Sequence, residues 1–268
     1  MLMTPVGVLL WILMFLTAVL FAMLGQGGGA VYTPLQVIFG VDFHIAATTS
    51  LFLIMSGAVA ALPVYYRAGV IDWPLALTLE AAAVAGGFAG GLISERFSQV
   101  FLTLTFAALV ALVAVLMIAN LRIESCARLP TFTRLCWQRQ HSSHSYRVNL
   151  LLGLPLAGLA GFASGLLGIG GGMFLVPLMV LVLGVPIEIA IGSSSLMVGL
   201  TAAAGFSGHL LAGHWDWRTS LLLAAIVFLG ARFGAHLSIK TDKRRIQGIF
   251  GWLLLALAGS MLARIALN

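Results

Sequence analysis

Two glycine-rich segments contain the residues of this chain best suited to bind a ligand. Gly25–Gly29 reads GQGGG, and Gly168–Gly172 reads GIGGG. Glycine leaves backbone N–H groups unshielded, and a helix that begins just after such a turn points its unpaired N–H groups and positive dipole end at the same place. Each segment therefore predicts a binding site for a small anion, made without a full positive charge.

The same kinds of residue follow both segments. A proline comes five residues after the last glycine, and a cluster of hydroxyl residues that could donate further hydrogen bonds comes later. Gln26 could donate its amide to a ligand or only satisfy the turn. The alternative is purely structural, because membrane glycines also pack helices and Ser or Thr side chains also bond to their own helix. The predicted substrate-binding residues are Gln26, Gly27, Gly28, Gly29, Pro34, Thr48, Thr49, Ser50, Gly170, Gly171, Gly172, Pro177, Ser193, Ser194 and Ser195.

The composition indicates an integral membrane protein. Of the 268 residues, 61% are hydrophobic and only 8% are charged, which is too little polar surface for a water-soluble fold. The net charge of +6 comes from bases in the loops between apolar runs. That distribution is typical of cytoplasmic loops and argues against nucleic-acid binding. The expected partners are the lipid bilayer and a small anionic substrate.

Apolar segments must position the two glycine turns. A helix needs about 20 residues to cross the hydrocarbon core. Eight segments reach roughly that length, and two short segments directly follow the glycine turns. We therefore expect an all-α polytopic membrane protein with about 8 full spans plus two short broken or re-entrant helices. The expected segments are 6–24, 30–39, 45–65, 73–93, 100–119, 150–167, 173–183, 187–211, 217–237 and 246–265.

The chain reads as two homologous repeats. Residues 1–119 form the first transmembrane half, 120–149 a cytoplasmic linker loop and 150–268 the second half. The glycine turns and their prolines match at an offset of 143, and Asp72-Trp73 matches Asp216-Trp217 at an offset of 144. We expect both aspartates to be helix N-caps beside interfacial tryptophans.

Loop charges favour inverted repeats. The linker holds five arginines, so it is placed inside. If each short segment counts as a crossing, each half has five crossings, and the loop with Lys240, Lys243, Arg244 and Arg245 also falls inside. An odd number of crossings inverts the second half relative to the first. In a reducing cytoplasmic linker, Cys126 and Cys136 are expected to be free thiols.

A few charged residues lie within the apolar segments. Glu80 and Arg232 are predicted to contact each other as a buried ion pair, although each could instead reach water alone. Among the histidines, His209 lies deepest in an apolar run and is the first choice for proton coupling, ahead of His44, His214 and His236. A packed, neutral His209 is the alternative.

Several other site types are not predicted. The linker spacing C-x9-C-x4-H-x2-H is not a usual zinc pattern, so no metal site is expected. No lysine follows either glycine turn, so there is no nucleotide-binding loop, and no cofactor is predicted. No convergent acid, base or nucleophile set is recognised, so the chain is not expected to be an enzyme.

The paired G-x-G-G-G-x4-P motifs, each with a Thr-Ser or Ser-Ser doublet downstream, resemble the TauE/SafE family of sulfite exporters and 4-toluene sulfonate uptake permeases. The resemblance covers nearly the whole chain outside the linker. It implies a permease of the bacterial inner membrane for sulfite, organosulfonates or related anions. We expect a secondary transporter that works by alternating access between the two repeats, with the substrate between the glycine turns, and a homodimer is one possible assembly. The alternatives are an intramembrane enzyme or sensor, or a carrier of a different ion.

Overall fold

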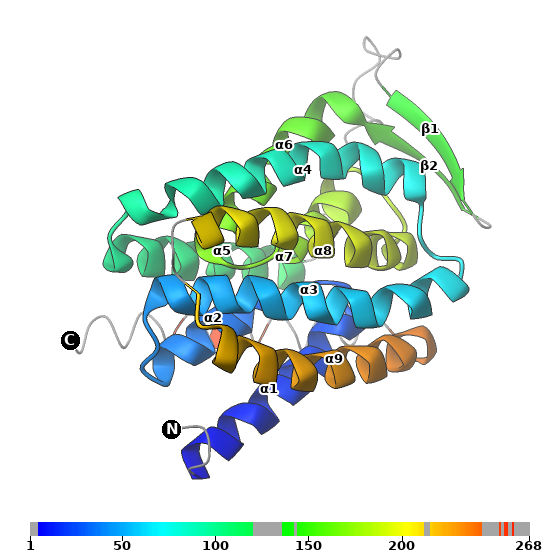
Figure 1. The fold of residues 1–268 in the computed structure, drawn as a ribbon. Coiled ribbons are helices and arrows are strands. Elements are labelled where there is room, and N and C mark those ends of the chain that lie inside the picture. Colours follow the sequence, from blue (N-terminus) through cyan, green and yellow to red (C-terminus); the bar gives the residue numbers. More distant parts are fainter. Residues whose placement is uncertain are drawn as a thin grey trace.

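The computed structural model describes residues 5–119, 136–141, 144–211 and 215–242, together with Trp252, Leu255, Ala256 and Gly259. These residues form a helical bundle with one β-hairpin at its end (Figure 1). In the first half the helices are α1 (Pro5–Met23), α2 (Gly29–Ile38), α3 (Phe43–Arg67), α4 (Trp73–Ile93), the 3-10 turn η1 (Ser94–Arg96) and α5 (Gln99–Ala119). In the second half they are α6 (Leu150–Leu167), α7 (Gly172–Pro177), the π-helical turn η2 (Leu178–Val182), α8 (Ile187–Leu211) and α9 (Trp217–Lys240).

Short polar side chains fix where several helices begin. Asp72 accepts a hydrogen bond from the Leu75 amide at the start of α4, and Asp216 accepts from Arg218 and Thr219 at the start of α9. An N-cap side chain satisfies amides that the helix itself leaves unpaired. The prediction that both aspartates are N-caps is therefore confirmed.

The molecule has the character of an all-α membrane protein. Five described helices are long and apolar enough to cross a membrane: Phe43–Arg67, Trp73–Arg96, Leu150–Leu167, Ile187–Leu211 and Trp217–Lys240. Large apolar side chains such as Leu159, Leu229 and Phe233 are exposed on the bundle surface, as expected for a surface in contact with lipid. The expected segment 246–265 lies almost entirely outside the described residues.

The helices of the two halves pack on each other in a reciprocal way. Helix α4 packs on α6 and α8, α9 packs on α1 and α3, and α3 packs on α8 (Figure 1). Small residues bring the axes very close. A Cβ atom on Gly165 of α6 would lie 1.9 Å from the Gly87 carbonyl oxygen of α4, and one on Gly234 of α9 would lie 2.2 Å from the Val19 carbonyl oxygen of α1. Only glycine permits such an approach.

Contacts between the helices give their directions. Ala83 and Gly87 of α4 meet Gly161 and Gly165 of α6 in the same order, so these two helices run in the same direction. By the same reasoning α4 is parallel to α8, and α9 is parallel to α1 and α3. In contrast, Leu51 and Ala58 of α3 meet Gly205 and Gly199 of α8 in reverse order. Helices α1, α3 and α9 therefore run opposite to α4, α6 and α8.

A β-hairpin lies at the end of the bundle where α4, α6 and α8 begin (Figure 1). Strand β1 (Cys136–His141) pairs antiparallel with β2 (His144–Asn149), with Arg139 opposite Tyr146. We predicted only a polar loop here. The missed signal is the alternation in β2, in which Tyr146 and Val148 are buried on either side of the exposed Arg147.

The prediction of a free thiol is wrong for Cys136, which is disulfide-bonded. The chain contains one other cysteine, Cys126, which lies outside the described residues. The free-thiol prediction depended only on the expected compartment. Whether two sulfurs meet is instead decided by how the chain folds, which the charge of a loop does not encode.

Candidate functional site

The two glycine turns, 143 residues apart in sequence, meet each other in the middle of the bundle. A Cβ atom on Gly29 would lie 2.3 Å from the Ile169 carbonyl oxygen, and one on Gly172 would lie 2.6 Å from the Gln26 Cα atom. Ile54 of α3 and Val198 of α8 pack against the same glycines. The structure therefore brings together the two segments that the sequence singled out.

The turns need glycine for conformational reasons as well. Gly27 and Gly28 have φ angles of 76° and 87°, and Gly170 and Gly171 have φ angles of 78° and 72°. Side chains other than glycine are strained in this left-handed region. The turns end at α2 and α7, whose N-caps Gly28 and Gly171 supply no side-chain hydrogen bond.

Several backbone N–H groups in the turns have no acceptor within the described part of the chain. In the first turn they belong to Gly27, Gly28, Gly29 and Ala30, and in the second turn to Gly170, Gly171 and Met173. Buried N–H groups are nearly always paired, so a cluster of unpaired ones is unusual. Such a cluster is chemically suited to an anion.

Gln26 adds an amide to the first turn. Its side chain is 1% exposed, and neither Nε2 nor Oε1 has a hydrogen-bond partner within the described residues. A buried amide without partners is unfavourable by a few kcal/mol. Of the two predicted roles, satisfying the turn is therefore not what this amide does, and its N–H groups are available for a ligand.

Most of the predicted hydroxyl groups already bond to the protein. Thr48 and Ser195 donate to carbonyl groups of their own helices, at 2.7 Å to the His44 oxygen and 2.7 Å to the Gly192 oxygen. Ser50 accepts from the Gln36 amide at 3.0 Å, and Thr49 lies 3.2 Å from the Ser220 hydroxyl. Thr48 and Ser195 thus bond within their own helices, whereas Thr49 and Ser50 link neighbouring helices.

Ser194 instead supports the first glycine turn. Its hydroxyl donates to the Gly25 carbonyl oxygen at 2.6 Å. On the other side of the site, Thr33 of α2 donates to the Gly168 carbonyl oxygen at 3.1 Å. Each half therefore contributes a hydroxyl that fixes a carbonyl in the glycine turn of the other half. Pro34 and Pro177 are buried in α2 and α7.

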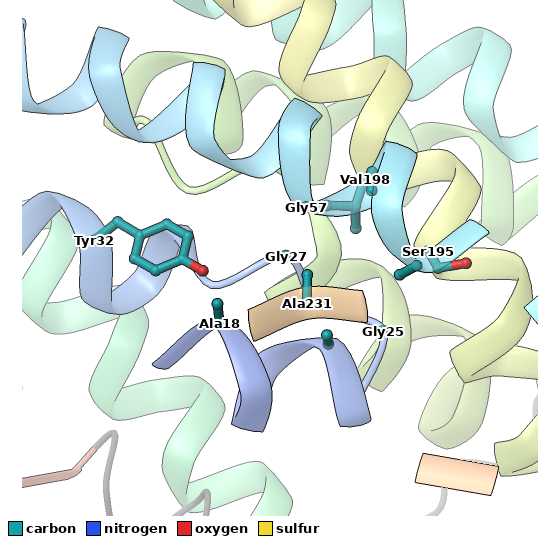
Figure 2. A pocket seen from close by; sticks show the side chains of 11 residues that line it. Ala18, Gly25, Gly27, Tyr32, Gly57, Ser195, Val198 and Ala231 are labelled. Carbon is teal, nitrogen blue, oxygen red and sulfur yellow. The ribbon is translucent and has the colours of Figure 1, made fainter. Parts of the chain in front are cut away.

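A small pocket opens beside the first glycine turn (Figure 2). The Tyr32 hydroxyl points toward Gly27, and no hydrogen bond is found for it among the described residues (Figure 2). Sequence reasoning missed Tyr32, although it lies only three residues after the last glycine of the turn. The remaining lining residues are Ala18, Ala22, Gly25, Gly57, Ala58, Ala61, Ser195, Val198 and Ala231.

The predicted contact between Glu80 and Arg232 does not form. Glu80 is 3% exposed on α4, where it accepts a hydrogen bond from the Thr201 hydroxyl of α8 at 2.8 Å. Arg232 is exposed on α9, which packs on α1 and α3 instead. A similar depth along two helices does not make side chains neighbours when the helices lie on opposite sides of the bundle.

His209 is packed between helices. It is fully buried, with Nε2 2.9 Å from the Gly165 carbonyl oxygen and Nδ1 3.4 Å from the Ser94 hydroxyl. A neutral ring that donates from Nε2 and accepts at Nδ1 satisfies both contacts. This geometry fits the structural alternative better than proton coupling. His44 shares the Ser94 hydroxyl, His236 is exposed, and His214 lies outside the described residues.

The hairpin is attached to the bundle through Asp72. Arg139 contacts this carboxylate with Nη2 at 2.6 Å and Nε at 3.1 Å, and Tyr146 donates to it at 2.5 Å. Burial by itself would raise the pKa of Asp72, but the hydrogen bonds from Arg139, Tyr146 and Leu75 hold the pKa below the ordinary aspartate value. The Asp72 amide in turn donates to the Ser193 hydroxyl at 3.0 Å, so one of the predicted site serines is linked to the hairpin.

Comparisons with known proteins identify the family of the chain. Residues 10–261 match the family model described as Sulfite exporter TauE/SafE. The chain is 24% identical to the probable membrane transporter protein YunE of Bacillus subtilis over 89% of this chain and 91% of that one. It is 27% identical to the probable membrane transporter protein YdhB of the same species, over 87% and 89% of the two chains.

A shorter match is closer in sequence. A probable membrane transporter protein of Xylella fastidiosa is 38% identical over 43% of this chain and 44% of that one. No solved structure matches the chain. The family and the names of the relatives support a membrane transporter rather than an enzyme. The family model matches nearly the whole length of the chain, and the paired glycine turns and helical membrane architecture agree with it. The chain therefore belongs to the TauE/SafE family.

Proposed function

We propose that this chain is a secondary transporter for small sulfur-containing oxyanions such as sulfite or an organosulfonate, with the substrate bound between the two glycine turns. The observation that carries the proposal is the cluster of unpaired backbone N–H groups where the turns meet. The unpartnered amide of Gln26 and the hydroxyl of Tyr32 lie beside the same cluster. Weak donors that converge from several directions suit an oxyanion.

We further propose that the two halves are inverted repeats that alternate access to this site. Each matched pair of helices, α1 with α6, α3 with α8 and α4 with α9, runs in opposite directions. The reciprocal packing of α4 on α6 and α8, and of α9 on α1 and α3, is what a two-fold relation between halves produces. Rocking one half against the other would then expose the site to each side in turn.

The proposed orientation places the hairpin side in the cytoplasm of the bacterial inner membrane. Arg67, Lys240 and the hairpin residues Arg139 and Arg147 all lie at that end of the bundle. The disulfide of Cys136 favours the opposite orientation, because disulfides are typical of oxidising compartments. We base the orientation on the charge distribution, because several residues from both halves contribute to it, whereas the disulfide argument involves one cysteine.

Flux into proteoliposomes tests the proposal. Purified protein should transport labelled sulfite or an organosulfonate faster than empty vesicles do. No flux of sulfite, sulfate, thiosulfate or sulfonates above empty vesicles would refute it.

Matched glycine variants test the site itself. Gly28→Ala should abolish flux, because the new Cβ atom would lie 2.6 Å from the Tyr32 ring and disturb the turn. Gly40→Ala is the control, since Gly40 has nearly the same φ angle (88° against 87°) but nothing within 4 Å of the added atom. Gly171→Ala and Gly184→Ala form a second pair, with φ angles of 72° and 69°. Equal flux within both pairs would exclude the turns as the site.

A further inference from the structure

Glu80 is a buried acid that lies close to one glycine turn. It is located on α4, eight residues after Asp72, which places it about 12 Å into the helix at about 1.5 Å per residue. Its side chain is 3% exposed at the interface of α4 with α8. Within the part of the chain that the structure describes, no cation forms an ion pair with Glu80.

The two oxygens of this carboxyl group have very different surroundings. Oε1 accepts the hydrogen bond from Thr201 at 2.8 Å, whereas Oε2 is buried and has no partner within the described residues. An ionised carboxylate needs hydrogen-bond donors at both oxygens, and a single bond from a neutral hydroxyl does not offset its removal from water. In this conformation the group therefore holds a proton on Oε2.

Thr201 connects this carboxyl group to the second glycine turn. While its hydroxyl bonds Glu80, its methyl carbon Cγ2 lies 3.3 Å from the position of a Cβ atom on Gly171. Thr201 therefore lies between the acid and the turn. An anion bound at the turn disfavours a second negative charge on Glu80, so anion binding and protonation of Glu80 support each other.

The other ionisable residues on the elements around Glu80 are distant from it or already paired. Helix α6, which packs on α4, carries no ionisable residue, and α8 carries Glu188 in its exposed first turn and His209. His209 lies eight residues beyond Thr201, or about 12 Å along α8. At the far end of α4, η1 contributes the exposed Glu95 and Arg96. At the near end, Arg139 and Tyr146 are engaged by Asp72.

The acid is present in one half only. At the offset of 144 residues that relates the halves, Ala224 corresponds to Glu80 and Gly57 corresponds to Thr201. At the position that the repeat relates to the Thr201–Glu80 pair, the chain has Gly57 and Ala224, and Gly57 lines the pocket. The first half's Glu80 thus has no acidic counterpart in the second half.

We propose that Glu80 carries a proton together with each oxyanion, so that transport is proton-coupled; this inference rests on the proposed function. Glu80 takes a proton from water on one side of the membrane while the site is open to that side. It returns the proton to water on the other side after the halves have rocked and the anion has left. A singly charged sulfonate then crosses with no net charge.

The test uses an organosulfonate, because its charge does not change near neutral pH. Proteoliposomes are prepared with the membrane potential held at zero and an interior about one pH unit more alkaline, which can drive about tenfold accumulation for one proton per anion. Wild-type protein should accumulate the sulfonate and acidify the interior. Glu80→Gln, which remains neutral, should lose accumulation yet still exchange internal for external sulfonate.

Controls separate the two proposals. Glu188→Gln makes the same change at an exposed acid of α8 and should behave as the wild type. An infrared band of a protonated carboxyl group should be present in the wild type and absent from Glu80→Gln, whatever the transport result. If the wild type exchanges sulfonate but the pH gradient drives no accumulation, or if Glu80→Gln accumulates normally, the coupling role is overturned and the transport proposal stands. If the wild type exchanges no sulfur oxyanion at all, the proposed function itself fails.

Discussion

Replacement of Arg139 by methionine should release the β-hairpin from the helix bundle. Arg139 makes two hydrogen bonds to Asp72, whose side chain is fully buried, while Arg139 itself is 19% exposed. After the replacement, the carboxylate keeps only the donors from Tyr146 and Leu75. A hydrogen bond to a charged group contributes about 1.5–3 kcal/mol, and breaking a buried ion pair by removing one partner costs about 3–5 kcal/mol.

Water reaches the outer side of Arg139, so the lower part of that range applies. A loss of about 3 kcal/mol corresponds to roughly 150-fold more frequent opening of the hairpin. Amide hydrogen exchange measured by mass spectrometry reports this opening directly. Peptides covering Cys136–His141 and His144–Asn149 should exchange roughly 150-fold faster, while peptides from α8 should not change.

The control is Arg147→Met, because Arg147 is an exposed arginine of the same hairpin and faces Gln138 across the strands. A double-mutant cycle with Asp72→Asn isolates the pair, since asparagine can still cap α4. If Arg139→Met exchanges no faster than Arg147→Met, or if Asp72→Asn and Arg139→Met are additive, the buried pair does not hold the hairpin in place.

Three further predictions follow from the same contacts. Because Asp72 has a folded pKa below its unfolded value, it stabilises the hairpin above about pH 4. The protection of the hairpin amides from exchange, relative to their intrinsic rates at each pH, should therefore fall only as the pH falls through the lowered pKa. A loss of protection that begins near neutral pH would assign the attachment to another group. Gly165→Ala should prevent folding or lower the melting temperature strongly, because its Cβ atom would lie 1.9 Å from the Gly87 carbonyl oxygen, whereas Gly158→Ala on the same helix has 3.6 Å to its nearest atom and should be tolerated; equal melting temperatures would show that α4 and α6 can separate without loss. After reduction, Cys136 should react with a membrane-impermeant maleimide only in inside-out vesicles, and labelling in right-side-out vesicles would reverse the proposed orientation.

The sequence by itself determined most of the helices of this protein, but not its hairpin. Apolar runs and their punctuation predicted α4, α6 and α8 to the residue, because a membrane helix must be long, uncharged and bounded by polar or turn-forming residues. Asp72 and Asp216 marked helix starts for a local reason, the pairing of the first amides. The glycine turns were visible as candidate sites because consecutive glycines inside an apolar segment are costly without a role.

Only the tertiary structure decided which of these elements meet. It joined the two glycine turns at a backbone contact and engaged most of the predicted hydroxyl groups with the protein itself. It also placed Thr201, and not Arg232, beside Glu80, since α9 packs on the far side of the bundle from α4. Helix starts depend on neighbours along the chain, which a sequence records. The partners of a buried acid depend on how helices cross, which the apolar pattern of each helix leaves open.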